Sequence, residues 1–310
     1  MQSREKSASL EPDKGQGPVP FLRWAGGKRK LAETIVSTFP NTFNPIENNF
    51  FEPFVGGGAV TMHLGNKYQK TFVPGKNIFI NDLNPDLVTT YKVVQQDPNK
   101  LMKKLDSISK RLDRDEFEKI RASKFNSPID IAARFIYLNK TCFNGLWRVN
   151  SKGEFNVPWG KLKNPLIYNE DNIKLASERL FGATITNFNY PTVLENARKN
   201  DLVYLDPPYI PINQTSNFSK YAKEDFGPLD QYALAGVIDG LTAKGVKVIL
   251  SNSDTAMTRK IFGDSLSLHQ LLVTRSISAK SSSRIQVSEL IGVNFNIPKS
   301  SLLNYLRVVS

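Results

Sequence analysis

The sequence predicts an α/β fold in which a sheet with parallel strands is interrupted by a mostly helical insertion. Three segments predict the sheet, because each is a short apolar run followed by a turn: Asn48–Gly65, Lys76–Asp82 and Asp201–Tyr209. A change in composition predicts the insertion. Residues 95–180 begin with a helical, strongly charged pattern, and the alternation of strand and helix patterns returns only after Phe181.

The segment Asn48–Gly65, with the sequence NNFFEPFVGGGAVTMHLG, has the pattern of a buried strand, a glycine turn and a helix. The next strand, KNIFIND, ends in Asp82. Together they form half of a Rossmann-like, nucleotide-binding βαβ unit. The glycines let a cofactor approach the backbone, although their spacing is not that of the dinucleotide fingerprint. An acid in the position of Asp82 can accept hydrogen bonds from ribose hydroxyls.

The insertion has two parts. The first, from Asp97 to Tyr137, has a helical pattern, and most of its charges are those of a solvated helix face. The second, Thr141–Gly160, contains Asn-Gly and Lys-Gly dipeptides between β-prone pieces, which indicates a hairpin or an ordered loop. We therefore expect a flexible tail at residues 1–17, a catalytic domain at 18–94 and 181–300, and a recognition domain at 95–180.

After the insertion the strand patterns continue with DLVYLDPPY and GVKVILSNSD. The segments LHQLLVTRSIS and ELIGVNF then predict a terminal β-hairpin.

Composition narrows the class of protein. The chain has 310 residues, a net charge of +12, two histidines and one cysteine, Cys142. A single cysteine excludes an internal disulfide framework and a multi-cysteine zinc site, and no metal is expected. The positive charge suits a nucleic acid partner. No apolar run is long enough for a membrane span, and the polar start lacks the features of a secretory signal, so we expect a cytoplasmic protein.

The most specific motif is Asp206-Pro207-Pro208-Tyr209, at the end of a predicted strand. Ligands of open α/β sheets bind beyond the carboxyl ends of the strands. The Asp206 carboxylate and the Pro207 carbonyl could accept both N–H groups of an exocyclic adenine amine, which would localise its lone pair for attack on a sulfonium methyl group. Tyr209 would stack on the base. The alternative is a strand-ending turn in which the aspartate caps a helix.

A further motif lies near the start, where Phe21–Lys28 reads FLRWAGGK. Trp24 could form an aromatic wall, and Lys28 could supply a cation for a carboxylate. Taken alone, the motif is better explained by a core tryptophan and a solvated lysine, and it supports a ligand site only in combination with the other motifs.

These motifs, in this order, resemble the Dam family of N6-adenine DNA methyltransferases, over about Pro20 to Phe295. The resemblance includes YLNKTCFNGLWRVNSKGEFNVPWGK, which is similar to the family's recognition hairpin. It implies S-adenosylmethionine as donor, S-adenosylhomocysteine as product, double-stranded DNA as partner and GATC as target. It also implies base flipping, because adenine must leave the stack to reach Asp206. We expect the protein to act as a monomer without an obligate protein partner.

The resemblance also implies roles for individual residues. Those expected around the cofactor are Trp24, Lys28, Phe54, Gly56, Gly58, Asp82, Phe188 and Asp206. Those expected at the DNA are Arg23, Phe143, Asn144, Leu146, Arg148, Pro158, Lys161, Ser216 and Asn217. Phe143 replaces the usual tyrosine and keeps an apolar wedge between base pairs. Arg148 would contact a guanine, and Arg23 replaces a lysine that reaches the outer guanine.

Three alternatives have distinct signatures. N4-cytosine methylation uses similar amine chemistry, but it goes more often with serine in place of Asp206. A catalytically inactive DNA-binding protein on the same scaffold is the second. Cytosine C5 methylation needs a thiol in a Pro-Cys context, and Cys142 lies between Thr141 and Phe143, so an ordinary thiol is expected. Trp147, where smaller residues are common, has no explanation in the sequence.

Overall fold

The computed structural model describes residues 17–68, 75–209, 226–276, 284–298 and 306–308. Within these residues one eight-stranded sheet runs in the order β3-β2-β1-β4-β5-β7-β6-β8. The strands are β1 (Phe50–Glu52), β2 (Ile78–Asn81), β3 (Thr184–Thr186), β4 (Leu202–Leu205), β5 (Lys247–Ser253), β6 (Ser267–Ser276), β7 (Arg284–Val293) and β8 (Leu306–Val308). The first five strands in this order are parallel, and β7, β6 and β8 add antiparallel pairings.

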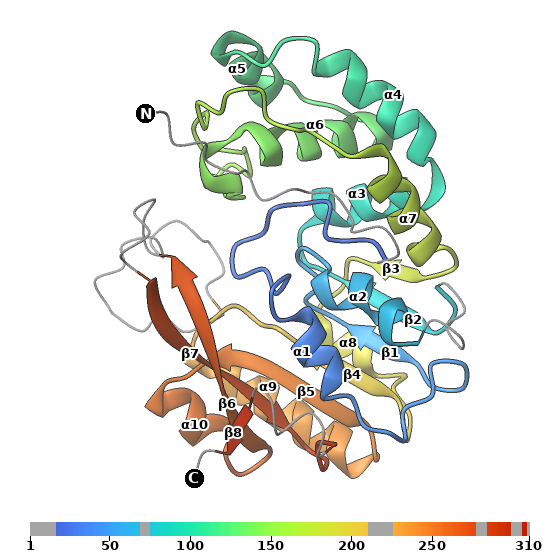
Figure 1. The fold of residues 1–310 in the computed structure, drawn as a ribbon, viewed down its shortest axis with the longest axis vertical. Coiled ribbons are helices and arrows are strands. Elements are labelled where there is room, and N and C mark those ends of the chain that lie inside the picture. Colours follow the sequence, from blue (N-terminus) through green and yellow to red (C-terminus); the bar gives the residue numbers. More distant parts are fainter. Residues whose placement is uncertain (1–16, 69–74, 210–225, 277–283, 299–305, 309–310) are drawn as a thin grey trace.

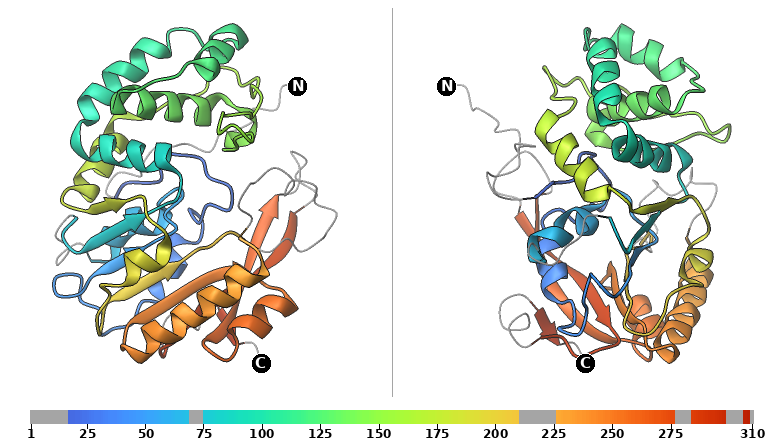
Figure 2. Two further views of the ribbon diagram at one scale, coloured as in Figure 1. Left: turned by 180° about the vertical axis from the view of Figure 1, so that it is seen from behind. Right: turned by 90° about the vertical axis from the view of Figure 1, so that its right-hand side faces the viewer.

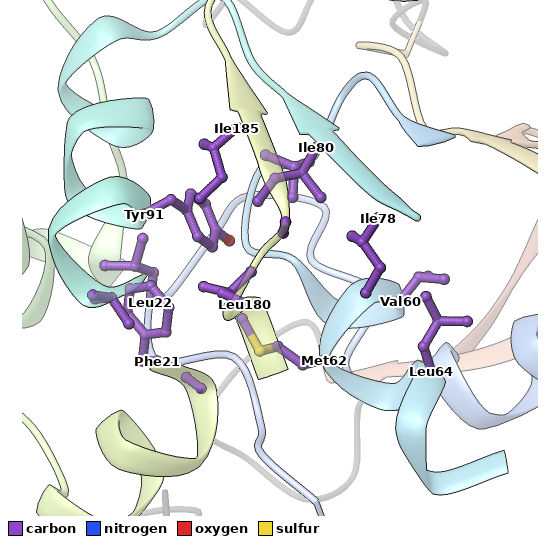
Figure 3. Packing of buried hydrophobic residues seen from close by; sticks show 14 of the residues in the cluster. Phe21, Leu22, Val60, Met62, Leu64, Ile78, Ile80, Tyr91, Leu180 and Ile185 are labelled. Atoms are coloured by element: carbon purple, nitrogen blue, oxygen red, sulfur yellow. The ribbon is translucent and has the colours of Figure 1, made fainter. Parts of the chain in front are cut away.

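Helices cover both faces of this sheet because alternate strand residues point to opposite sides. Phe50, Tyr204 and Ile249 belong to a core shared with helices on one face. Phe51, Val203 and Val248 belong to a second core with helices on the other face. The helices of the first core include α1 (Ala32–Ser37), α2 (Ala59–Lys67), α3 (Pro85–Gln96) and α7 (Glu170–Leu180). The helices of the second core are α8 (Tyr190–Leu194), α9 (Pro228–Ala243) and α10 (Ala256–Phe262). Figure 3 shows part of the first core, in which Tyr91 lies between Ile185 and Phe21, and Met62 lies near Leu180.

The insertion forms a helical layer at one end of the sheet (Figures 1 and 2). It contains α4 (Pro98–Ile108), α5 (Arg114–Ala122), α6 (Pro128–Thr141) and the short 3-10 helix η1 (Phe143–Gly145). Phe117, Tyr137 and Phe155 are buried in a cluster of their own within it. Helix α6 packs against α3, α4 and α5, so the insertion is joined to the sheet domain through a continuous helical layer.

The expected elements are found, with one difference. The segments LHQLLVTRSIS and ELIGVNF pair as the antiparallel strands β6 and β7, but this hairpin is not terminal, because β8 pairs with β6 beyond it. The segment Thr141–Gly160 is an ordered loop with hairpin-like pairing, in which the bridges Cys142–Trp159 and Val149–Phe155 are isolated. The domain boundaries stay a prediction. Helix α3 runs across the position expected for the first boundary, and the expected tail lies outside the described residues except for Gly17.

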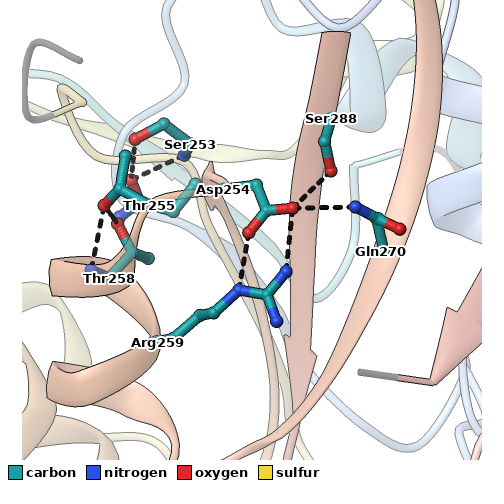
Figure 4. A network of polar contacts seen from close by, with 8 residues as sticks. Ser253, Asp254, Thr255, Thr258, Arg259, Gln270 and Ser288 are labelled. Atoms are coloured by element: carbon teal, nitrogen blue, oxygen red, sulfur yellow. Dashed lines mark hydrogen bonds and ion pairs between the residues drawn. The ribbon is translucent and has the colours of Figure 1, made fainter. Parts of the chain in front are cut away.

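A polar network fixes the β6–β7 hairpin to the end of β5 (Figure 4). The Asp254 carboxylate accepts hydrogen bonds from Arg259 at 2.8 and 3.0 Å, from Gln270 on β6 at 3.0 Å and from Ser288 on β7. These donors hold the pKa of Asp254 below its ordinary value. One carboxylate therefore joins α10 to both strands of the hairpin.

Within the described residues, no helix combines the length and the apolar character that crossing a membrane requires.

Candidate active site and nucleic-acid interface

The candidate site lies at the carboxyl ends of β2, β1 and β4, which are adjacent in the sheet. The glycine turn follows β1, Asp82 follows β2 and Asp206 follows β4. Strand β1 pairs with both β2 and β4, so the strand order reverses its direction at this point. A crevice beyond such a switch point is the usual ligand site of a doubly wound sheet.

Asp206 is held by Lys28 and Tyr209. The Lys28 ammonium lies 2.9 Å from Asp206 Oδ1 and 2.8 Å from the Gly26 carbonyl, and only 4% of its side chain is exposed. The Tyr209 hydroxyl donates to the same carboxylate oxygen at 3.2 Å, and the Lys28 nitrogen lies 4.8 Å from the centre of the Tyr209 ring. Burial raises the pKa of Asp206, and the Lys28 charge opposes that shift. Lys28 is therefore a buried partner of Asp206 rather than a solvated lysine.

The glycine turn lies against Trp24. Gly56 has a φ of +45°, and a Cβ there would come within 2.7 Å of the Trp24 ring. Gly58, the N-cap of α2, has a φ of +68°, and a Cβ there would meet the Tyr91 hydroxyl. That hydroxyl donates to the Gly56 carbonyl at 2.9 Å. Side chains are thus excluded from this turn by close packing as well as by backbone conformation.

Asp82 and Phe188 are brought to the same edge of the sheet by buried polar contacts. Asp82 accepts the Gly56 amide at 3.1 Å and the Asn84 amide at 2.9 Å, and burial raises its pKa. Asn81 binds both the amide and the carbonyl of Phe188, at 2.8 and 3.0 Å, while the Phe188 ring is 55% exposed. Leu83, next to Asp82, is also exposed. The sequence reasoning missed Asn81 and Leu83, although both adjoin the acid that it identified.

Phe54 and Glu52 flank the turn from the strand side. The Phe54 ring packs against Tyr190 and Phe226, with ring centres 5.1 and 5.7 Å away. Glu52 is buried and accepts hydrogen bonds from the amide and hydroxyl of Thr61. Burial raises the pKa of Glu52 to about 8, with a smaller contribution from the Asp206 charge. Sequence reasoning gave Glu52 no role, because a strand-end glutamate carries no local signal of its burial.

The predicted recognition residues lie together in the loop that follows α6. The Arg148 guanidinium donates through Nε to the Asn156 side chain at 2.7 Å, across the loop. The Phe143 amide donates to the Pro158 carbonyl at 2.9 Å, and the Phe143 ring is half exposed. Asn144 and Lys161 both have positive φ and are exposed. Leu146 is half-buried against the core of the insertion.

Arg23 is joined to this loop by Asn139, a fully buried residue of α6 that the sequence reasoning missed. The Asn139 side chain accepts the Arg23 amide at 2.8 Å and donates to the carbonyls of Arg23 and Gly145, at 2.7 and 3.1 Å. A Cβ at Gly145 would come within 2.6 Å of the Arg23 side chain. The structure therefore brings Arg23, from the start of the chain, against the loop that follows α6 (residues 142–160), called the recognition loop after its predicted role.

Trp147 has a packing role. Its ring centre lies 3.8 Å from that of Phe135 on α6 and 4.7 Å from that of Phe155 on the other side of the loop. The large side chain therefore anchors the loop to α6, which explains its presence among recognition residues.

Cys142 is buried, and burial raises the pKa of its thiol to about 11. A thiol of this kind is a poor nucleophile, in agreement with the expectation of an ordinary cysteine. Ser216 and Asn217, expected at the DNA, lie outside the described residues.

Comparisons with known proteins point to one family. Residues 24–277 match the model of the D12 class N6 adenine-specific DNA methyltransferases. The type II methyltransferase M.MjaIII of Methanocaldococcus jannaschii is 38% identical over 89% of this chain and 99% of its own length. The type II methyltransferase M1.LlaDCHI of Lactococcus lactis is 37% identical over 89% and 95%. The DNA adenine methylase of Haemophilus influenzae is 33% identical over 94% and 98%.

Proposed function

Because the chain belongs to the D12 class of N6-adenine-specific DNA methyltransferases, we propose that it uses S-adenosylmethionine to methylate the adenine of GATC, with Asp206 as the catalytic carboxylate. The observation that carries the proposal is the position of Asp206 after β4, beside the glycine turn of β1. The same proposal includes the residues expected above to bind the cofactor, those expected to contact the DNA, and the segment Asp206–Tyr209.

The chain's residues fit S-adenosylmethionine. Gly56 keeps the turn after β1 free of a side chain, and the neighbouring Asp82 carboxylate can accept ribose hydroxyls. The exposed Phe188 and Leu83 offer apolar surface for the cofactor adenine. When bound, the cofactor supplies a sulfonium methyl group, whose transfer to N6 breaks the carbon–sulfur bond, leaves the electron pair on sulfur and releases one proton from the nitrogen.

Asp206 can orient the adenine amine. In the described part of the chain, the contacts of Lys28 and Tyr209 both reach Oδ1, and none reaches Oδ2. No hydrogen bond within those residues ends on the Pro207 carbonyl either. Oδ2 and the Pro207 carbonyl can therefore accept the two amine protons, while Lys28 maintains negative charge on the carboxylate.

The recognition loop supports GATC as the target through its resemblance to the Dam family's hairpin. Arg148 presents donors suited to a guanine, and its guanidinium is already oriented by Asn156. Phe143 is an exposed apolar ring that can enter the space left by a flipped base.

The test is methyl transfer from labelled S-adenosylmethionine to duplexes that carry GATC, GTTC or no site. We expect label only in the GATC duplex, recovered as N6-methyladenine. We expect Asp206→Ala to abolish it while the protein stays folded, with an unfolding temperature lowered by the loss of the Lys28 partner. Label in every duplex would refute the target. Activity retained in Asp206→Ala would refute the catalytic assignment, and no label on any duplex would favour an inactive scaffold.

A further inference from the structure

Two buried side-chain amides connect the segment Asp206–Tyr209, called here the catalytic loop after its proposed role, to the core of the sheet. Gln231 lies in the first turn of α9 and Asn252 near the end of β5, and both are fully buried. Gln231 Nε2 donates to the Pro208 carbonyl at 2.9 Å, and its Oε1 accepts Asn252 Nδ2 at 3.1 Å. Asn252 Oδ1 accepts the Ser253 amide at 2.8 Å. The chain of bonds therefore runs from the catalytic loop through α9 to β5.

The loop offers few other attachment points. Pro207 and Pro208 have no backbone N–H, so their carbonyls are the polar groups by which the backbone can be held there. An amide side chain donates from one end and accepts at the other, and each end of Gln231 has a partner that requires that orientation. The bond to Pro208 thereby fixes one carbonyl of the pair and leaves the Pro207 carbonyl to the substrate.

We propose that Gln231, supported by Asn252, is a positioning residue that sets the orientation of the Asp206–Tyr209 loop for methyl transfer. The inference rests on the proposed role of Asp206. In this proposal Gln231 acts through the Pro208 carbonyl and not by direct contact with the base or the methyl donor. We expect substitution of Gln231 to lower kcat, because a small displacement of the Asp206 carboxylate and the Pro207 carbonyl disturbs the alignment of the amine.

The decisive variant is Gln231→Glu, which preserves the size of the side chain. An ionised glutamate still accepts from Asn252, but it presents an acceptor to the Pro208 carbonyl. A protonated one can donate to that carbonyl and restore the bond. Activity of the variant is therefore expected to fall as pH rises through the pKa of the new carboxyl. The titratable groups at this end of α8, α9, β1, β4, β5 and β7 are Tyr190, Asp230, Tyr232, Glu52, Tyr204, Asp206 with Lys28, Tyr209, Asp254 and Glu289.

A matched control perturbs the same two elements at their other end. Asn294 accepts the Val248 amide at 2.8 Å and donates to the Val246 carbonyl and the Thr242 hydroxyl, both at 2.8 Å. Asn294→Asp weakens the contact between α9 and β5 without touching the catalytic loop. Asn252→Asp is the second test variant, because it removes the donor to Gln231 and leaves the acceptor for Ser253.

The measurement is kcat for a GATC duplex, relative to wild type, from pH 6 to pH 9, with the Kd of S-adenosylmethionine and the unfolding temperature measured in parallel. We expect Gln231→Glu to lose about 10- to 100-fold in kcat at the alkaline end and to recover towards acid pH. Asn252→Asp should show a loss of the same sign, and Asn294→Asp should follow the wild-type profile. Cofactor affinity should be unchanged.

The proposal is overturned if folded Gln231→Glu follows the wild-type pH profile, or if Asn294→Asp changes the profile equally. Failure of the proposed function has a different signature, since Asp206→Ala would then retain activity. If Asp206→Ala is inactive and Gln231→Glu has the wild-type profile, only the positioning role is wrong.

Discussion

At the residue scale, the site depends on charged groups placed where water is largely excluded. Lys28 is 4% exposed and Glu52 is 2% exposed, yet ionisable residues are seldom buried without a partner. Lys28 has Asp206 at 2.9 Å. Within the described residues, Glu52 is hydrogen-bonded to the neutral donors of Thr61, so its carboxyl is most stable in the protonated form. Burial of Lys28 is therefore compensated by its ion pair with Asp206, whereas burial of Glu52 is tolerated because its carboxyl is protonated.

Glu52 makes stability depend on pH. Burial raises the pKa of its carboxyl from 4.5 to about 8 in the folded chain. Its contribution is fully present below the unfolded value and is lost as pH rises towards 8, because the unfolded chain ionises first. Glu52→Gln removes this titration, so the variant does not lose this stability as pH rises. We therefore expect the free energy of unfolding of the variant minus that of the wild type to increase by a few kcal/mol between pH 5 and pH 8, at about 1.4 kcal/mol per pKa unit. Urea unfolding at the two pH values measures it, and a constant difference would contradict the raised pKa.

At the element scale, the recognition loop is organised by contacts from three directions. Trp147 packs it on α6, Asn139 joins it to the segment that carries Arg23, and Asn156 holds Arg148 across it. The loop pairs through isolated bridges rather than a continuous ladder, so its shape comes from these side chains. A loop held in this way can present donors to a DNA groove with little loss of conformational entropy on binding.

Arg148→Ala tests the loop as the source of sequence discrimination. Loss of the guanidinium is expected to reduce discrimination at one guanine by about 1 to 3 kcal/mol, with a smaller effect on non-specific binding. The measurement compares kcat/KM for GATC with that for duplexes changed at each position. Lys152→Ala, at the exposed tip of the same loop, is the control and should leave discrimination unchanged. Equal discrimination in wild type and Arg148→Ala would contradict the assignment of the loop.

The chain's motifs were sufficient to predict several elements and insufficient for others. Asp82 and Asp206 could be placed because the strand patterns before them are strong and acids after parallel strands share an edge. Trp147 could not be explained, because its partners Phe135 and Phe155 lie 12 and 8 residues away in sequence and meet only in the folded loop. Strand β8 was missed because its three residues carry almost no periodic signal.

At the scale of the whole molecule, the residues proposed for methyl transfer and those proposed for base recognition lie on different parts of the fold, the sheet and the helical insertion. Asp206, the proposed catalytic carboxylate, follows a strand of the sheet, and most of the residues proposed to read the bases lie in the insertion. The Phe21–Lys28 segment contacts both through Arg23 and Lys28. A net charge of +12 favours contact with phosphates.

The charge predicts a measurable salt dependence. The logarithm of the DNA association constant should fall linearly with the logarithm of salt concentration, with a slope of about −0.9 for each phosphate contacted. Lys161→Ala, beside the recognition loop, is expected to reduce that slope by about one such contact without changing sequence discrimination. Lys244→Ala, at the far end of α9, is the control and should leave the slope unchanged. Fluorescence anisotropy over a salt series measures both, and equal slopes in wild type and Lys161→Ala would contradict a phosphate contact.

The sequence by itself determined the α/β class, the family resemblance and the positions of Asp82 and Asp206, because these depend on local patterns that end at strand termini. Only the tertiary structure decided the partners of those residues. Lys28 meets Asp206 across 178 positions, Asn139 meets Arg23 across 116, and Gln231 meets Pro208 across 23. Such contacts form only when distant segments are brought together by burial of the apolar faces of the sheet and its helices, and no local pattern records them.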